Sequence, residues 1–392
     1  MDFSTLQEMV LIAHERVSPE LWEFINGATE SETTARRNRA AIDCLALRPR
    51  VLRDVSEINT TTSFLGRTLN IPLMMAPVGS LALIDPAGAI PVARACAGAG
   101  TLMFYSTFAD PPLEEVSRAV PDPLVLALYV RGDQDWLDRA IDEALAAGCH
   151  AIAVVTEAPY YSRRERDLIN QFRSRGSKSG TYAATQKILR DRAGDDTFKA
   201  AHARMEPARL TWRTIERIRV RSGLPIVLKG IATREDAVLA VEAGIGAIYV
   251  SNHGGRQLDH AAGTLDTLPE IVEAVAGRAE VIVDGGICRG TDVLKAVALG
   301  AKAACAGRLQ CWALAAGGEA GVVRALEILE EEILISMGLI GVTRLDELRP
   351  KHLRQVEAIE PADLLDAFPV AKETIARARE DRLGRAAPKQ RS

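Results

Sequence analysis

The sequence is poor in aromatic residues, carries little net charge and contains no long apolar run. Aromatic residues make up 5% of the 392 residues, and the six cysteines include no Cys-x-x-Cys pair. Scattered cysteines of this kind are typical of reduced thiols rather than of a disulfide or zinc framework. The first residues also lack the basic and apolar regions of a signal peptide. We therefore expect a cytoplasmic protein without a membrane span.

The near balance of charges argues against a nucleic-acid-binding protein. The formal net charge is -4, whereas nucleic-acid binders normally present a basic face. With 47% hydrophobic and 26% charged residues, the chain is long enough for one large core or two ordinary ones. Its 30 glycines indicate many tight turns between strands and helices.

Eight short apolar runs recur along the chain with regular spacing. Each is apolar throughout rather than alternating, which is typical of parallel strands buried on both faces. Amphipathic stretches such as 135–147 and 234–243 lie between most of them. This alternation predicts an α/β fold of the (β/α)8 TIM barrel type. The expected strands are Ile71–Ala76, Thr101–Ser106, Leu124–Val130, His150–Thr156, Leu224–Lys229, Gly246–Ser251, Ala279–Asp284 and Lys302–Ala306.

The segments outside this repeat complete what we expect to be one domain over residues 1–392. Residues 1–60 form an N-terminal helical extension, in which 4–16 is a helix that begins with Ser4 and Gln7 spaced as a capping box. The barrel covers 71–350 and includes a long mobile loop, 172–208, after the fourth strand. Residues 372–392 hold seven Lys or Arg and form a frayed basic tail or, alternatively, a docking segment.

Reactive side chains gather at the ends of the expected strands. In a barrel of this type, the loops that follow the strands meet at one mouth. That mouth is therefore expected to combine a tyrosine, a histidine, several cations and acids. The residues are Tyr129, Glu157, Arg163, Arg164, Lys229, His253, Arg256, Asp259, Asp284 and Arg308.

Glycine-rich turns after the seventh and eighth strands predict a phosphate site. The turns at Asp284-Gly285-Gly286 and Gly307-Arg308 expose backbone N–H groups, and each following helix adds its positive end. The side chains of Arg289 and Arg308 would supply charge-assisted hydrogen bonds. Lys229 would stabilise negative charge on a ring that the phosphate tethers. A phosphorylated flavin suits both features.

His253 is the candidate general base, because the glycines that follow it let the backbone come close to a ligand. Arg164 and Arg256 would clamp a carboxylate through paired N–H donors. Glu157 would hold the imidazole and stabilise its cationic form. Each residue has a plainer alternative: a structural histidine, a solvated arginine on a helix face, or an acid that caps a helix.

The stretch Ser251–Asp259 reads SNHGGRQLD. Together with the two glycine turns, it resembles the FMN-dependent 2-hydroxy acid oxidase and dehydrogenase family. Members include glycolate oxidase, lactate oxidase, mandelate dehydrogenase and flavocytochrome b2. The resemblance runs from about Pro19 to His352 and implies FMN as cofactor. It implies oxidation of a 2-hydroxy acid to the 2-oxo acid, with His253 taking a proton while a hydride, or an electron pair, goes to flavin N5.

The resemblance also assigns roles to individual positions. Arg164 and Arg256 match the carboxylate clamp, Tyr129 the substrate tyrosine and Lys229 the lysine beside the flavin anion. It further implies a homotetramer and an electron acceptor that is oxygen, a quinone or a redox protein. The positions expected to bind FMN are Pro77, Val78, Gly79, Ser106, Lys229, Ser251, Asp284, Gly285, Gly286, Arg289, Gly307 and Arg308.

Several positions depart from the family pattern. Glu23 replaces a tyrosine that helps to bind the carboxylate, and two like charges about 4 Å apart repel by roughly 4 kcal/mol at an intermediate dielectric. Glu23 must therefore turn away, be protonated or pair with a cation. The other departures, each written with the family residue it replaces, are Phe108 for tryptophan, Ala127 for glutamine, Val155 for threonine, Glu157 for aspartate and Cys288 for arginine.

Three hypotheses follow from this pattern. The first is oxidation of a 2-hydroxy acid with FMN. The second keeps this flavin chemistry but applies it to a larger substrate, or to one with an amine that meets Glu23. The third is a flavin-binding protein that has lost turnover because its ring contacts are weakened.

Overall fold

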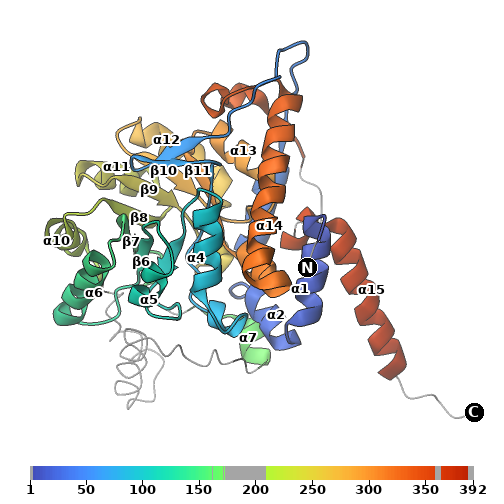
Figure 1. Cartoon of the computed structure of the whole chain (residues 1–392), viewed down its shortest axis with the longest axis horizontal. Coiled ribbons are helices and arrows are strands. Elements are labelled where there is room, and N and C mark those ends of the chain that lie inside the picture. Colours follow the sequence, from blue (N-terminus) through green and yellow to red (C-terminus); the bar gives the residue numbers. More distant parts are fainter. Residues whose placement is uncertain (1–2, 161, 171, 173–208, 358–362, 387–392) are drawn as a thin grey trace, which may run out of the picture.

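The computed structural model describes residues 3–160, 162–170, 172, 209–357 and 363–386. Eight parallel strands form one sheet, and helices surround it (Figure 1). Each expected strand overlaps one observed strand, so the predicted fold class is confirmed. In their order across the sheet, the strands are β4 (Leu73–Met75), β11 (Ala303–Ala306), β10 (Glu280–Val283), β9 (Ala247–Val250), β8 (Ile226–Ile231), β7 (Ala151–Val155), β6 (Val125–Leu128) and β5 (Phe104–Ser106).

The two end strands of this order meet and close the barrel. A parallel bridge joins Met75 of β4 to Met103 just before β5, and the Met75 amide donates to Leu102 O over 3.0 Å. Closure of this kind removes the exposed edges that an open sheet would have.

One apolar layer lies inside the barrel and another lies between the strands and the surrounding helices. Inside the barrel, Phe104 packs on Phe64 and Tyr249, with ring centroids 6.2 and 5.3 Å apart. Outside it, the strands pack against the apolar faces of the helices. The helices that alternate with the strands are α4 (Ala89–Gly98), α5 (Leu113–Arg118), α6 (Gln134–Ala146), α7 (Glu165–Ile169), α10 (Trp212–Ser222), α11 (Arg234–Glu242), α12 (Thr264–Val275), α13 (Gly290–Ala298) and α14 (Arg308–Ile340).

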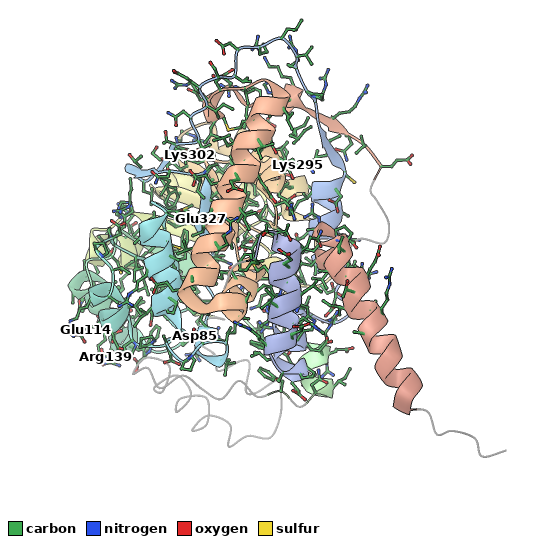
Figure 2. The ribbon with its side chains drawn as sticks, turned by 45° about the vertical axis from the view of Figure 1, so that its right-hand side comes forward. Asp85, Glu114, Arg139, Lys295, Lys302 and Glu327 are labelled. Carbon is green, nitrogen blue, oxygen red and sulfur yellow. The ribbon has the colours of Figure 1, made fainter. Side chains whose placement is uncertain are left out.

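The N-terminal extension is helical only up to Asp43 rather than over residues 1–60, and it packs beside α14 (Figure 1). It contains α1 (Leu6–Arg16), α2 (Pro19–Asn26) and α3 (Thr33–Asp43). The predicted capping box is displaced by one residue, because Thr5 and Glu8 form it instead of Ser4 and Gln7. Figure 2 shows Lys295 of α13, whose ammonium donates to Ile42 O at the end of α3 over 3.0 Å.

The prediction of a frayed tail is wrong over most of its length. Residues 369–386 form the helix α15 (Pro369–Ala386), which packs against α1. Just before it, Phe368 is buried against Trp312 of α14, with ring centroids 5.5 Å apart. This apolar anchor, which the basic composition concealed, orders the start of the segment. Residues 387–392 lie outside the described part of the chain.

The remaining elements are short. β1 (Leu45–Leu47) pairs with β12 (Leu353–Gln355), and β2 (Thr62–Phe64) pairs with β3 (Arg67–Leu69). Of the expected mobile loop 172–208, only Phe172 belongs to the described residues. No helix within the described ranges has the length and apolar content that crossing a membrane requires.

Candidate active site

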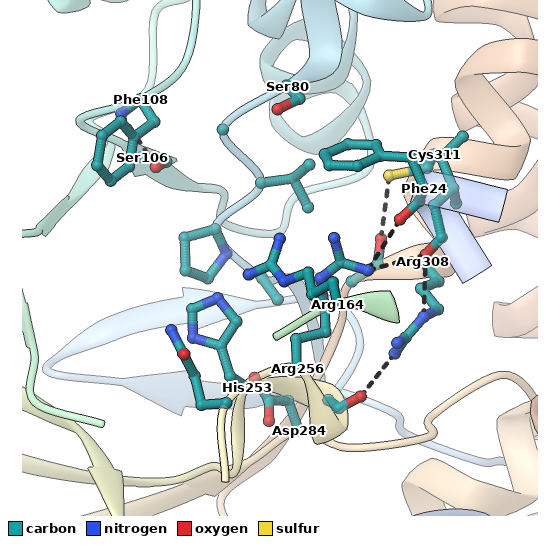
Figure 3. Close-up of a pocket in the computed structure, with 18 of the residues that line it drawn as sticks. Phe24, Ser80, Ser106, Phe108, Arg164, His253, Arg256, Asp284, Arg308 and Cys311 are labelled. Carbon is teal, nitrogen blue, oxygen red and sulfur yellow. Dashed lines mark hydrogen bonds between the residues drawn. The ribbon is translucent and has the colours of Figure 1, made fainter. Parts of the chain in front are cut away.

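A cavity of about 570 Å³ lies at the carboxyl ends of the barrel strands. Figure 3 shows Arg164 and Arg256 side by side in it, with His253 beside them. Most of the predicted site residues line this one cavity. They are Pro77, Val78, Gly79, Ser106, Tyr129, Arg164, Lys229, His253, Arg256, Asp284, Gly285, Gly286, Gly307 and Arg308.

His253 sits on a strained turn after β9. Its φ is +59°, and the two glycines that follow have φ of +62° and +77°. A left-handed histidine is unusual, and strain of this kind concentrates at functional sites. Two side chains hold the turn: the His253 amide donates to Ser251 Oγ over 3.1 Å, and the Gly255 amide donates to Asn252 Oδ1 over 3.1 Å.

The two nitrogens of the His253 ring have different partners. Nδ1 lies 3.0 Å from Glu157 Oε1, so its proton is donated to the carboxylate. Nε2 lies 3.5 Å from the Tyr129 hydroxyl and faces the cavity as an acceptor. Burial lowers the pKa of His253 to about 4, Lys229 adds to the shift and Glu157 opposes it. The imidazole is therefore neutral at neutral pH and able to take a proton.

Glu157 lies behind the cavity wall and also contacts Lys229. The same oxygen, Oε1, accepts from the Lys229 ammonium, which further donates to Ser251 Oγ over 2.9 Å. Burial alone would raise the pKa of Glu157, but Lys229 and His253 lower it to about 2. Burial alone would likewise lower the pKa of Lys229, but Glu157 and Asp284 raise it. Both groups are therefore ionised.

Arg256 is a partly buried cation whose backbone contacts fix its position. Its Nη1 donates to Gly27 O over 2.6 Å and to Phe24 O over 2.9 Å. Burial lowers its pKa well below the usual value, and Arg164 and Arg308 add to this effect. Neighbouring cations that destabilise one another form a site that an anion would stabilise.

The glycine turns differ in what they offer an anion. At the start of α13, Asp292 Oδ2 accepts from the amides of Cys288 and Arg289, and Glu332 Oε2 accepts from that of Gly290. The protein's own carboxylates thus cap that helix. At the start of α14, Gly307 and Arg308 line the cavity directly.

The side chain of Arg289 lies away from the predicted phosphate site, whereas Arg308 lines the cavity but donates to backbone carbonyls. Arg289 pairs with Glu332 and does not line the cavity. The Arg308 guanidinium donates to the carbonyls of Ile25, Gly254 and Gly27 over 3.1, 2.9 and 2.9 Å. Arg308 thus keeps its charge near the cavity while its donors organise the backbone around it.

Glu23 pairs with a cation, which was one of the three expected outcomes. Its Oε2 accepts from Arg166 Nη1 over 2.7 Å, and Arg166 also binds Glu32 over 2.6 Å. Glu23 is not among the residues that line the cavity. The prediction that it contacts substrate therefore finds no support in its position.

The other departures remove polar groups from the interior. Ala127 and Val155 are buried, and Phe108 packs on Tyr129 with ring centroids 4.9 Å apart. Cys288 lies buried in the cavity wall at the turn before α13. Buried polar residues that still line the cavity include Ser106, Lys229 and Asp284.

Arg131 lines the cavity and was missed in the sequence analysis. It is buried, and its guanidinium lies 5.0 Å from the centroid of Phe108 and 5.5 Å from that of Tyr129. Because strand side chains alternate between faces, Arg131 continues the face of Ala127 and Tyr129. That two-residue spacing was the signal available in the sequence.

Comparison with known proteins places the chain among flavoenzymes. A family model described as FMN-dependent dehydrogenase matches residues 13–355. L-lactate oxidase from Nostoc sp. is 42% identical over 337 residues, which cover 84% of this chain and 92% of the relative. 4-Hydroxymandelate oxidase from Amycolatopsis orientalis is 39% identical over 341 residues, or 87% of this chain and 95% of the relative.

Solved structures give the same result. A crystal structure of mandelate oxidase is 36% identical, has a TM-score of 0.80 and covers 91% of this chain and 100% of its own. A mandelate oxidase variant with an FMN adduct is 37% identical, with a TM-score of 0.78, and covers 90% of this chain and 99% of its own.

Proposed function

The chain belongs to the family of FMN-dependent dehydrogenases and oxidises a 2-hydroxy acid to the 2-oxo acid, and on this premise we propose which of its residues carry the reaction. One observation supports the assignment above others. A neutral histidine, a tyrosine hydroxyl and a pair of arginines converge on the cavity that the glycine turns line. A base, a carboxylate clamp and a phosphate cradle are thus brought together.

The residues around the cavity fit FMN. Gly285 and Gly286 have φ of +102° and +87°, and a Cβ on Gly285 would lie 2.4 Å from Thr264 Oγ1. The turn is therefore restricted to glycine and keeps its backbone open to the cavity. Within the described part of the chain, the buried Asp284 Oδ1 has no hydrogen-bond partner, so it is available to a ligand.

The phosphate would rest on Gly286, Gly307 and the first amides of α14. The positive end of this helix and the nearby Arg308 favour an anion there. The isoalloxazine ring would lie between Lys229 and the segment from Pro77 to Gly79. When bound, FMN would supply the ring that accepts the substrate's hydride.

His253 would remove the substrate's hydroxyl proton at Nε2. Its Nδ1–H stays donated to Glu157, which fixes the tautomer and stabilises the imidazolium that forms. Tyr129 lies within reach of the same oxygen and would orient it. Arg164 and Arg256 would hold the carboxylate, since planar guanidinium groups bind carboxylates through paired bonds.

The substrate side chain would be larger than that of lactate, and apolar or aromatic. The outer part of the cavity is lined by Phe24, Phe108, Leu168 and Phe172, and the rings of Phe24 and Phe172 lie 4.6 Å apart. An amine-bearing substrate loses its rationale, because Glu23 pairs with Arg166 and does not line the cavity.

Oxygen is the proposed electron acceptor, and a quinone or a redox protein is the alternative. The two curated relatives described above are named oxidases. Rapid mixing of the reduced protein with air-saturated buffer tests this proposal. Reoxidation that is slower than turnover with a quinone would contradict it.

The central experiment is anaerobic addition of 2-hydroxy acids to the yellow protein. We expect rapid bleaching of the flavin by mandelate and other bulky hydroxy acids, and slow bleaching by glycolate and lactate. Efficient turnover of glycolate or lactate alone would contradict the proposed substrate class. A flavin that no hydroxy acid reduces would favour the third hypothesis, a binding protein without turnover.

The family resemblance further leads us to propose a cytoplasmic homotetramer. The exposed apolar side chains of Leu334, Ile335 and Leu339 on α14 support self-association. Light scattering would measure the mass of the particle. A parent protein with the mass of a monomer would contradict this proposal. A particle mass that Ile335→Glu and Leu339→Glu both leave unchanged would contradict the role of this α14 surface.

A further inference from the structure

A single carboxylate oxygen of Glu157 holds both the base and the lysine of the cofactor site. Oε1 lies 3.0 Å from His253 Nδ1 and also accepts from the Lys229 ammonium. The other oxygen, Oε2, is buried and has no hydrogen-bond partner among the described residues. The carboxylate therefore serves the Lys229 ammonium and the neutral His253 ring through one oxygen rather than through two.

The surroundings leave the carboxylate little freedom to move. The side chains of Lys229, Glu157 and His253 are only 3%, 9% and 16% exposed. A Cβ on Gly230 would lie 2.4 Å from Oε2 and 2.7 Å from Glu157 Cβ. The absence of a side chain at Gly230 thus provides the space that the carboxylate occupies.

Charged or polar groups on four other elements face this trio. Asp284 after β10 lies 4.0 Å from the Lys229 ammonium, and Tyr129 after β6 lies against His253. Arg164, just before α7, acts on His253 as a further positive charge. Ser251, after β9, accepts from both the Lys229 ammonium and the His253 amide. None of these four groups contacts both the Lys229 ammonium and the His253 ring with an anionic atom, as Glu157 does.

We propose that Glu157 is a positioning residue that couples proton transfer to the charge at the cofactor ring. In the resting site its oxygen is shared, so it partly neutralises Lys229. When the substrate O–H bond breaks and an N–H bond forms at His253 Nε2, the imidazolium attracts the carboxylate more strongly. The Lys229 charge is then released toward the cofactor as the substrate's C–H hydrogen passes with its electron pair to the cofactor and the C=O bond of the 2-oxo acid forms.

This role rests on the proposed function and depends on the length of the side chain. Family members are expected to carry an aspartate here, which is one methylene shorter. Glutamate reaches both His253 and Lys229. We expect aspartate to keep the bond to His253 and to lose the contact with Lys229. The two contacts can therefore be separated by substitution.

The first test is a double-mutant cycle on the FMN-loaded protein, read by NMR of labelled histidine. Lys229→Met removes a cation and releases Glu157 entirely to His253, so the proton affinity of His253 should rise at least tenfold. In the Glu157→Gln background the same substitution should raise it several-fold less, because only the direct repulsion is removed. Equal shifts in the two backgrounds would overturn the proposal.

The second test is the reduction potential of bound FMN, which does not depend on turnover. Glu157→Gln and Glu157→Asp should both raise the equilibrium constant for two-electron reduction at least tenfold, or about 30 mV, because Lys229 is no longer neutralised. Glu157→Asp should not lower the His253 pKa, because the aspartate keeps its bond to His253, whereas Glu157→Gln should lower it. The exposed Glu165→Gln variant, from the same loop, should change neither quantity.

The outcomes separate this proposal from the proposed function. Potentials and a His253 pKa that do not respond to either Glu157 variant would overturn the coupling, even if hydroxy acids still reduce the flavin. Coupling that is present in a protein that no hydroxy acid reduces would instead contradict the proposed function alone. Should one variant fail to fold, the other still decides between the two results.

Discussion

The carboxylate of Glu23 lies 2.7 Å from the guanidinium of Arg166, so α2 is tied to α7. Arg164 of the proposed clamp lies two residues before Arg166, at the start of α7. The Arg163 carbonyl also accepts from the Glu30 amide over 2.8 Å. Where the family has a tyrosine that contacts substrate, this chain has an ion pair that positions the loop carrying the clamp.

We expect Glu23→Gln to raise KM about two- to fivefold and to leave kcat within twofold. A partly exposed ion pair contributes roughly 0.2–1 kcal/mol, and the loss is expected in binding because Glu23 does not reach the base. Steady-state kinetics with the best substrate measures the split. The exposed Glu20→Gln on the same helix is the control, and a KM that stays at the parent value would refute the positioning role.

Replacement of His253 by asparagine should lower kcat by a factor of roughly 10²–10⁴, the range typical for loss of a general base. Bound FMN should remain, because the glycine turns and Lys229 are untouched. Anaerobic flavin reduction by substrate measures the loss, and the absorbance of the purified protein measures retention of FMN. His260→Asn, an exposed histidine of the same segment, should behave as the parent. A His253→Asn variant that bleaches at the parent rate would remove His253 from the mechanism.

Val155→Thr should strengthen FMN binding and weaken the cofactor-free protein. The hydroxyl would be buried at the end of β7, where the family threonine bonds the flavin ring. With FMN, one added hydrogen bond should lower Kd about two- to tenfold; without it, the unpaired hydroxyl should cost about 1–3 kcal/mol. Flavin fluorescence titration and urea unfolding measure the two effects.

Val154→Thr is the matched control for this prediction. Its side chain is buried in the layer between the barrel and the helices, so its hydroxyl cannot reach the ring. We expect the same destabilisation without any gain in FMN affinity. Equal Kd values for the two variants would refute a flavin contact at position 155.

The protein should lose stability on mild acidification. His253 has a folded pKa of about 4, below its ordinary 6.5, so the unfolded chain binds the proton more readily. Stability is therefore lost as pH falls from about 6.5 towards 4, by about 2 kcal/mol between pH 7 and pH 5. Glu157, whose pKa is lowered to about 2, adds a further loss below about pH 4.5.

Denaturant unfolding at pH 7 and pH 5 measures this loss. His253→Gln should make the pH dependence shallower, since the group that titrates is gone, whereas His260→Asn should leave it unchanged. A parent protein that is equally stable at the two pH values would show that the His253 pKa is not depressed by burial.

The barrel and the cavity residues at the strand ends were predictable because they follow from local patterns, whereas Pro77, Val78, Gly79 and Ser106 were expected only from the family resemblance. Continuous apolar runs identify buried parallel strands, and strand ends identify the mouth, so His253 and Arg256 were found without coordinates. Arg131 was overlooked because its signal, two residues beyond Tyr129, depends on knowing where the strand face continues.

The errors have a common physical origin in partners that are distant in sequence. Arg289 pairs with Glu332 of α14, and Glu23 pairs with Arg166, over separations that no local motif encodes. The tail was misread because its composition is basic, while one buried aromatic side chain, Phe368, anchors it. The sequence gives the charge of each side chain, but not the residue with which it forms an ion pair.

The seam between β4 and β5 is the part of the barrel where bound FMN is expected to change amide hydrogen exchange most. This pair is joined by a single bridge at Met75 and Met103, while the other neighbouring strands share ladders of two to four residue pairs. Pro77, which follows β4, and Ser106, the last residue of β5, both line the cavity. Transient opening of the barrel would therefore begin beneath the flavin, and FMN would slow amide hydrogen exchange at the seam more than elsewhere in the sheet.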